Sequence, residues 1–291
     1  MPRLFCFGLG YTALALAGRL QQRGWRVAGT VRSEAAAASL RASGIEALLF
    51  DRVQPPQEAA AALAGTTHIL ASVPPDEQGD AVLDGWRAAI AQLDGLEWLG
   101  YLSTTGVYGD RAGEWVDETS PLQPTGVRGR RRLAAEQAWL ALWREQGVPV
   151  HLFRLAGIYG PGRSALDTIR SGRAQRIVKP GQVFSRIHVA DIAATLEASI
   201  ARPNPGAAYN VCDDNPAPPD EVLAYAASLL GVTPPPAVPF EDAQLSEMAR
   251  SFYADNKRVD NRRIKHELRV VLAYPDYRAG LTALLRDEQA G

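Results

Sequence analysis

The residues best suited to chemistry form a glycine-containing turn near the start of the chain. Gly8, Gly10 and Ala13 give the pattern G-x-G-x-x-A, which follows a strand-like segment and opens a helix-like one. The first glycine permits a tight turn, the second lets backbone amides approach a diphosphate, and the small alanine lets helix and strand pack closely. The helix N-terminus adds partial positive charge. The pattern predicts a dinucleotide site, and the alternative is a purely structural turn. Contacts are expected from Gly8, Leu9, Gly10, Tyr11 and Thr12.

The end of the second predicted strand indicates which dinucleotide is bound. An NAD site usually carries Asp or Glu about 20 residues after the turn, whereas an Arg accommodates the 2′-phosphate of NADP. Here the strand ends in Thr30, Arg32 and Ser33, and the first carboxylate is Glu34. A phosphate would gain charge-assisted hydrogen bonds from these side chains. The sequence therefore favours NADP over NAD, and the alternative is that Arg32 is an ordinary surface arginine.

The elements that position these residues alternate between strand and helix signals, which is typical of a parallel sheet with crossover helices. We predict a doubly wound α/β fold (Rossmann fold) with a small C-terminal α/β lobe. Strands are expected over residues 3–8, 25–31, 45–50, 67–72, 97–103 and 149–154, and helices over 12–23, 34–42, 78–93 and 128–145.

After Gly160 the alternation of strand and helix signals becomes less regular. We therefore divide the chain into a cofactor domain (1–160) and a mixed segment that returns to the sheet and forms a small substrate lobe (161–291). Strands are expected over 183–188 and 207–211. Helices are expected over 189–200, 219–230, 241–250 and 260–268, and the proline-rich stretch 233–239 is a stiff connector.

Composition excludes several functional classes. The formal charge of −1 gives no field that attracts nucleic acid or anionic lipid. No apolar run suits a membrane span, and the N-terminus lacks the regions of a signal peptide. The two cysteines fit buried thiols in a reducing compartment, and the four histidines lack metal-ligand spacing. We therefore expect a cytoplasmic protein that binds a small molecule and no metal, nucleic acid or membrane.

Several motifs follow one another along nearly the whole chain. They are FGLGYTA at residues 7–13, Asp51 after the third strand, STTGVYG at 103–109, RLAGIYGPG at 154–162, RIHVAD at 186–191 and YNVCDD at 209–214. In this order they resemble the motifs of the extended short-chain dehydrogenase/reductase family, of the NAD-dependent epimerase/dehydratase type.

The resemblance implies roles for residues outside the glycine turn. Asp51 matches an adenine contact, and Thr104 matches the catalytic Ser or Thr that hydrogen-bonds the reacting oxygen. Further cofactor contacts are implied at Ser72, Val73, Ser103, Ala156, Gly157 and Ile158.

The family's catalytic Tyr-x-x-x-Lys pair is replaced in this chain. Arg128 stands at the tyrosine position and Arg132 at the lysine position. An arginine stays protonated and cannot shuttle a proton, so the standard mechanism does not carry over. Arg132 retains the ability to donate to the nicotinamide ribose. The chain thus resembles atypical members that keep the cofactor site.

Two hypotheses address the missing pair. Tyr108, four residues after Thr104, is the nearest replacement acid, and the alternative is that it packs the loop. Arg128, together with Arg186, is expected to hold an anionic substrate group, although a solvated charge run explains the arginine cluster equally well. Four arginines at a helix start oppose the macrodipole, and such rule-breaking clusters are often functional.

The leading functional hypothesis is an NAD(P)-dependent oxidoreductase or epimerase-like enzyme. It would act on a hydroxyl or carbonyl carbon of a small substrate that is anionic or resembles a nucleotide sugar. The alternative is a non-catalytic NADP-binding sensor or structural protein. The sequence leaves a monomer and a homodimer both open.

Overall fold

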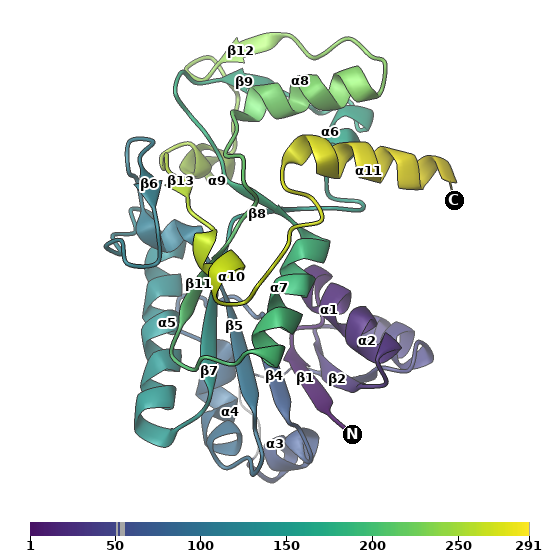
Figure 1. Ribbon diagram of the computed structural model, residues 1–291, viewed down its shortest axis with the longest axis vertical. Helices are drawn as coiled ribbons and strands as arrows, with labels where there is room; N and C mark the ends of the chain where they lie inside the picture. The colour runs from purple at the N-terminus through teal and green to yellow at the C-terminus, as the bar shows by residue number, and fades with distance from the viewer. Residues whose placement is uncertain (51, 53–55, 291) are drawn as a thin grey trace. The chain divides into compact units, whose positions relative to one another are not determined.

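The computed structural model describes residues 1–50, 52 and 56–290, and it contains a seven-stranded sheet in the order β11-β7-β5-β4-β1-β2-β3 (Figure 1). Asp51 lies outside the described residues. The strand bounds are β1 Arg3–Phe7, β2 Arg26–Val31, β3 Glu46–Leu49, β4 His68–Ala71, β5 Trp98–Thr104, β7 Val150–Leu155 and β11 Ala208–Val211. Strands β1, β2, β3, β4 and β5 pair in parallel, which confirms the doubly wound class.

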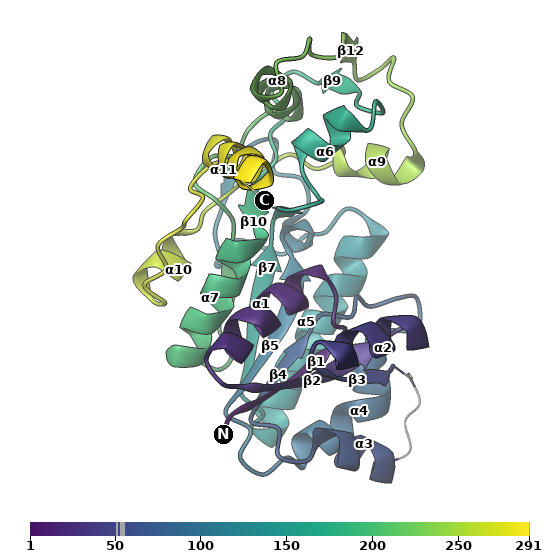
Figure 2. The same ribbon diagram turned by 90° about the vertical axis from the view of Figure 1, so that its right-hand side faces the viewer.

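Helices connect the strands and cover both faces of the sheet (Figures 1 and 2). Helices α1 and α2 lie over one face, and α3, α4 and α5 lie over the other. Their bounds are α1 Tyr11–Gln22, α2 Glu34–Ala42, α3 Pro56–Leu63, α4 Ala81–Ala91 and α5 Val127–Gln146. The helix α7 Val189–Ala201 follows later in the chain and precedes β11.

The face that carries α3, α4 and α5 packs a cluster of buried aromatic side chains against the sheet. Phe5 and Phe7 of β1 contact Trp86 of α4 at ring-centroid distances of 6.0 and 5.0 Å. Tyr101 of β5 lies 5.7 Å from Trp139 of α5. These side chains are buried, so Trp86 and Trp139 belong to the core.

Apart from two longer helices, the remaining elements are short. They are β6 Trp115–Val116, β8 Gly157–Tyr159, α6 Ala165–Arg170, β9 Arg176–Val178, β10 Arg186–His188, α8 Pro219–Leu229, β12 Ala237–Pro239, α9 Glu247–Phe252, β13 Arg258–Val259, α10 Arg262–His266 and α11 Tyr277–Ala290. Three two-stranded parallel pairs join β8 with β10, β9 with β12, and β6 with β13.

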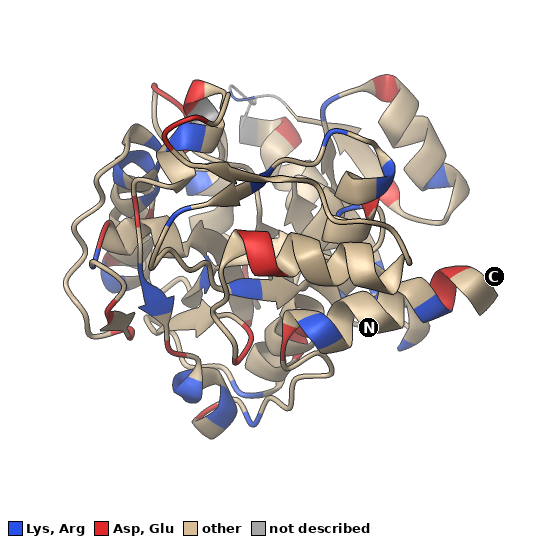
Figure 3. Ribbon diagram, turned by 90° about the horizontal axis from the view of Figure 1, so that it is seen from above, with Lys and Arg blue, Asp and Glu red and all other residues tan. Residues whose placement is uncertain are grey.

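The chain forms two compact units built from interleaved segments, whereas the sequence predicts a single division at residue 160. Unit 1 contains Met1–Thr104, Val127–Arg154 and Ala193–Tyr209, and unit 2 contains Thr105–Gly126, Leu155–Ile192 and Asn210–Gly291. Both charge signs are interspersed along the elements (Figure 3). Among the described residues, no helix has the length and apolar character needed to cross a bilayer.

Helix α11 is the largest element that was not predicted from the sequence, which suggested no helix after residue 268. Its buried residues are Tyr277, Gly280, Leu281 and Leu284, and their spacing is that of one helical face. The two helices expected over 241–250 and 260–268 are shorter in the structure, where α9 and α10 span six and five residues. The helical signal was therefore weakest in the C-terminal fifth of the chain.

Candidate functional site

The glycine turn between β1 and α1 is held by hydrogen bonds from two neighbouring strands. The Gly8 amide donates to Thr30 Oγ1 at 2.9 Å, and the Leu9 amide donates to Thr30 O at 2.8 Å. The Ser72 hydroxyl at the end of β4 donates to Gly8 O at 2.6 Å. Gly8 has a φ of +88°, and a Cβ there would lie 2.9 Å from Ser72 Oγ and 3.2 Å from Val73 Cγ2. Both the conformation and the space therefore require glycine.

Gly10 differs from Gly8 because the space next to it is open. A Cβ built on Gly10 meets no described atom within 4 Å, and Gly10 caps α1 without a side-chain hydrogen bond. The next two residues are the half-buried Tyr11 and the buried Thr12. The first amide groups of a helix have no acceptor within the helix, and no carboxylate stands in the first turn of α1 among the described residues. An open, uncapped and electropositive helix start fits the diphosphate of a dinucleotide.

The three residues predicted to contact a 2′-phosphate differ in exposure. Arg32 and Ser33 are exposed, directly after β2. Ser33 caps α2, and its hydroxyl accepts from the Ala36 amide at 3.3 Å. Thr30 is fully buried, and its hydroxyl oxygen accepts from Gly8. We therefore assign Thr30 to holding the turn, and the 2′-phosphate prediction depends on Arg32 and Ser33.

A buried ion pair fastens α5 beneath the end of β5. The Arg154 guanidinium donates to Glu136 at 2.9 Å, and the Ser103 hydroxyl donates to Glu136 Oε1 at 2.5 Å. All three residues are buried within unit 1. Ser103, predicted as a cofactor contact, thus points to Glu136, and this network fixes the strand residue that precedes Thr104.

Arg132, at the lysine position, is also anchored to β5. Its Nη1 donates to Leu102 O, and its guanidinium lies 5.7 Å from the Tyr101 ring centroid. Further along α5, the indole of Trp139 donates to Asp80 Oδ2 at 2.9 Å. Burial raises the pKa of Asp80 above its ordinary value. These contacts give Arg132 a structural role, and its hydrogen bond to the nicotinamide ribose stays a prediction.

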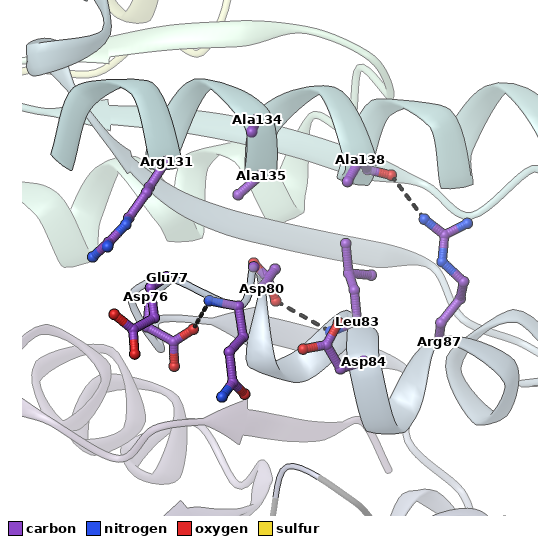
Figure 4. A pocket seen from close by; sticks show the side chains of 12 residues that line it. Asp76, Glu77, Asp80, Leu83, Asp84, Arg87, Arg131, Ala134, Ala135 and Ala138 are labelled. Carbon is purple, nitrogen blue, oxygen red and sulfur yellow. Dashed lines mark hydrogen bonds between the residues drawn. The ribbon is translucent and has the colours of Figure 1, made fainter. Parts of the chain in front are cut away.

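One member of the arginine cluster at the start of α5, Arg131, lines a pocket of about 450 Å³ between α4 and α5 (Figure 4). Arg131 points toward the side that carries Asp76 and Glu77. Arg87 on α4 donates to Ala138 O at 3.4 Å. Arg128 is exposed and is not among the described residues that line this pocket.

The loop after Thr104 belongs to unit 2, whereas Thr104 ends unit 1, so each is described within its own unit. Tyr108 is fully buried, and its hydroxyl donates to Asn210 Oδ1 at 2.7 Å. The backbone N–H of Asn210 donates to Glu118 Oε1 at 2.7 Å. A buried phenol whose hydroxyl donates to Asn210 is suited to holding the loop. This contact favours the alternative that Tyr108 packs the loop.

A buried lysine holds the same loop from the C-terminal segment. Lys257 Nζ donates to Gly109 O at 2.8 Å and lies 3.3 Å from Asp255 Oδ2. Burial lowers the pKa of Lys257. Gly109 has a φ of +70°, and a Cβ there would lie 1.9 Å from Gln123 O, so the turn accepts only glycine.

Three residues that the family resemblance implies as cofactor contacts, Ala156, Gly157 and Ile158, also lie in unit 2. The Ala156 amide donates to Val211 O at 3.1 Å, and the Gly157 amide donates to Ser185 O at 3.1 Å. Ile158 follows in β8, which pairs with β10. Arg186 begins β10 and lines a second pocket together with Ile158.

Five residues that hold predicted site residues in place were not predicted from the sequence. They are Glu136 and Arg154 in unit 1, and Glu118, Asn210 and Lys257 in unit 2. A signal existed for two of them. Glu136 interrupts the apolar stripe of a long helix, and Arg154 ends an apolar strand run. Charged residues in such positions are rarely buried without a partner, so the two together indicate a buried pair.

Comparison with known proteins assigns the family. Residues 8–212 match the model of the NAD dependent epimerase/dehydratase family, and the chain belongs to that family. The match begins at the first glycine of the turn.

Individual relatives agree with this assignment. The protein YeeZ of Escherichia coli K12 is 30% identical over 289 residues, covering 95% of this chain and 97% of that protein. A conserved protein of unknown function from Silicibacter pomeroyi DSS has 54% identity and a TM-score of 0.91, covering 99% of this chain and 100% of that chain. The dTDP-glucose 4,6-dehydratase of Bacillus anthracis, solved with NAD, has a TM-score of 0.77 at 16% identity, over 100% of this chain and 97% of that chain. This last likeness concerns the fold alone.

Proposed function

We propose that this protein is an NAD(P)-dependent oxidoreductase or epimerase-like enzyme that prefers NADP. The observation that carries the proposal is the glycine turn, where Gly10 leaves open space at the uncapped N-terminus of α1. The family model and the NAD held by the Bacillus anthracis dehydratase support a nicotinamide dinucleotide. Arg32 and Ser33 support the preference for the phosphorylated form.

The proposed chemistry acts on a carbon that bears a hydroxyl or carbonyl group. When bound, the nicotinamide ring supplies or accepts a hydride. Thr104 would hydrogen-bond the reacting oxygen and so stabilise the charge that develops on it. Ser103, Glu136 and Arg154 hold the strand end that carries Thr104. Each of Arg128 in unit 1 and Arg186 in unit 2 remains, by itself, a proposed ligand of an anionic substrate group.

A second candidate function is a cofactor-binding protein without turnover. It is favoured by two contacts: the Tyr108 hydroxyl is committed to Asn210, and Arg132 is anchored to Leu102 O. Neither residue is then an evident proton donor. NADPH oxidation assayed with aldehydes, ketones and nucleotide sugars separates the two functions, because the sensor binds NADPH and turns over no substrate.

The cofactor site is tested with two glycine variants in the same helix segment. Gly10→Ala adds a methyl group where no described atom lies, so folding is retained while close approach of the diphosphate is blocked. Losing one or two hydrogen bonds to a charged group weakens binding roughly 10- to 100-fold. The matched control is Gly18→Ala, whose Cβ also meets nothing within 4 Å.

Calorimetric titration with NADPH and NADH provides the measurement. We expect tighter NADPH binding by the unmodified protein, weak binding by Gly10→Ala and unchanged binding by Gly18→Ala. Equal NADPH affinity of Gly10→Ala and the unmodified protein would refute the phosphate site. Arg32→Ala should reduce the preference for NADPH over NADH, and an unchanged preference would refute the assignment of NADP.

A further inference from the structure

Unit 2 contains a cavity of about 500 Å³ bordered by β8, α6, α8 and α11. One part of its lining is apolar and includes Ile158, Leu223 and Leu281. Ligand pockets of this size typically combine apolar walls with a few polar groups that fix orientation. The apolar part therefore suits the hydrocarbon body of a small organic molecule.

The other part of the lining is basic. Arg163, Arg173 and Arg186 border the cavity, against the single carboxylate of Asp167. The Asp167 carboxylate already accepts from the amide and hydroxyl of Ser164 at the start of α6. The excess of positive charge favours a ligand with an anionic end.

Arg186 presents uncommitted donors. Its Nη1 donates to Phe184 O at 2.8 Å and to Ala217 O at 3.0 Å, which fixes the guanidinium plane. Among the described residues, no acceptor is bonded to its Nη2 or Nε. A guanidinium has five N–H donors in a rigid fork that matches an oxyanion, so the unused edge is a preorganised anion ligand.

Tyr277 also lines this cavity and carries a buried hydroxyl group. It is only 1% exposed, and its hydroxyl has no hydrogen-bond partner among the described residues. An unsatisfied buried hydroxyl destabilises a fold unless something binds it. A ligand oxygen would satisfy it.

The charge of Arg186 is not cancelled by the nearest buried acid. Asp213 is buried, and its Oδ2 has no hydrogen-bond partner within the part of the chain that the structure describes. Burial raises the pKa of Asp213 to about 8. The negative charges of Asp214 and Asp276 raise this pKa further, whereas the positive charge of Arg186 lowers it. Asp213 is therefore mostly neutral at pH 7, and Arg186 keeps a net positive charge.

We propose that this cavity binds the substrate, a small organic oxyanion with an apolar body, through the uncommitted N–H groups of Arg186 and the hydroxyl of Tyr277. That this oxyanion is the substrate rests on the proposed function, whereas its binding in the cavity does not. A carboxylate and a phosphate monoester share the required chemistry.

The test measures binding to the full chain by calorimetry, with 3-phenylpropionate and phenyl phosphate as probes and 3-phenylpropionamide as the neutral analogue. We expect at least one anion to bind and the amide to bind at least about tenfold more weakly, as for charge-assisted contacts. The anion that binds more tightly identifies the headgroup. Equal binding of the amide, or binding of neither anion, overturns the proposal.

Variants locate the bound anion. Arg186→Gln should weaken anion binding about tenfold or more, and Tyr277→Phe about fivefold. Arg170→Gln is the matched control, because Arg170 is exposed, pairs with Glu288 and lies outside the cavity lining. Leu223→Trp fills the apolar part and should abolish binding while leaving the Arg186 contacts intact. Anion affinity unchanged in both Arg186→Gln and Leu223→Trp overturns the proposal.

Titration of the same proteins with NADPH separates this inference from the proposed function. Arg186→Gln should bind NADPH like the unmodified protein, because the glycine turn lies in unit 1. Unmodified protein that binds NADPH but neither anion contradicts only the cavity assignment. Protein that binds an anion but not NADPH contradicts only the proposed function.

Discussion

Replacing Glu136 by glutamine tests whether the buried ion pair beneath β5 is required for stability. The side chains of Glu136 and Arg154 are 2% and 6% exposed, and they lie 2.9 Å apart. Glu136→Gln keeps the shape and removes the charge. The buried Arg154 guanidinium then loses the charge of the Glu136 carboxylate, and Ser103 loses a charged acceptor.

The expected loss follows from the burial of the pair. Removing one partner of a buried ion pair typically costs about 3–5 kcal/mol, because the remaining charge is uncompensated in a medium of low dielectric constant. Removing one partner of an exposed pair costs under about 1 kcal/mol. The control is Glu34→Gln, since Glu34 lies 2.5 Å from Arg41 and both side chains are largely exposed.

Urea unfolding followed by circular dichroism measures the free energy of unfolding of each variant. We expect Glu136→Gln to lose several times more stability than Glu34→Gln. The double variant Glu136→Leu/Arg154→Met should recover most of the loss, because it removes both charges. If Glu136→Gln and Glu34→Gln lose the same free energy, the argument from burial is refuted.

Two further variants test the second unit. Burial raises the pKa of Asp213 in the folded chain from the ordinary value of 3.8 to about 8. Between these pH values the folded chain therefore keeps a proton on Asp213 that the unfolded chain has released. The free energy of unfolding consequently falls as pH rises through this window. The stability of Asp213→Asn relative to the unmodified protein should therefore grow from the acid to the alkaline end of the window and level off above it, and parallel pH profiles of the urea midpoint would contradict this. Gly109→Ala should destabilise by more than about 2 kcal/mol through positive φ and a clash with Gln123 O. The control Gly126→Ala, whose Cβ meets nothing within 4 Å, should stay within about 0.5 kcal/mol of the unmodified protein, and equal losses in the two variants would contradict the steric argument.

Local patterns determined where the glycine turn lies and which class of fold contains it. The turn at Gly8 and Gly10, the apolar stripe of α1 and the strand runs of β1 and β5 all depend on residues close together in the chain. Periodicities of 3.6 and 2 residues reveal such elements directly. Helix α2 begins and ends at the predicted residues, Glu34–Ala42.

Only the tertiary structure decided which side chains meet. Tyr108 is committed to Asn210, which lies 102 residues further along the chain, and Lys257 reaches Gly109 across 148 residues. Ser103 and Thr30 are predicted cofactor contacts by position, and in the fold their hydroxyl groups form hydrogen bonds with Glu136 and Gly8. Sequence spacing fixes the period of an element and leaves open which distant partner completes a buried polar group. That partner is set by packing, because a buried donor or charge must be satisfied within the folded chain.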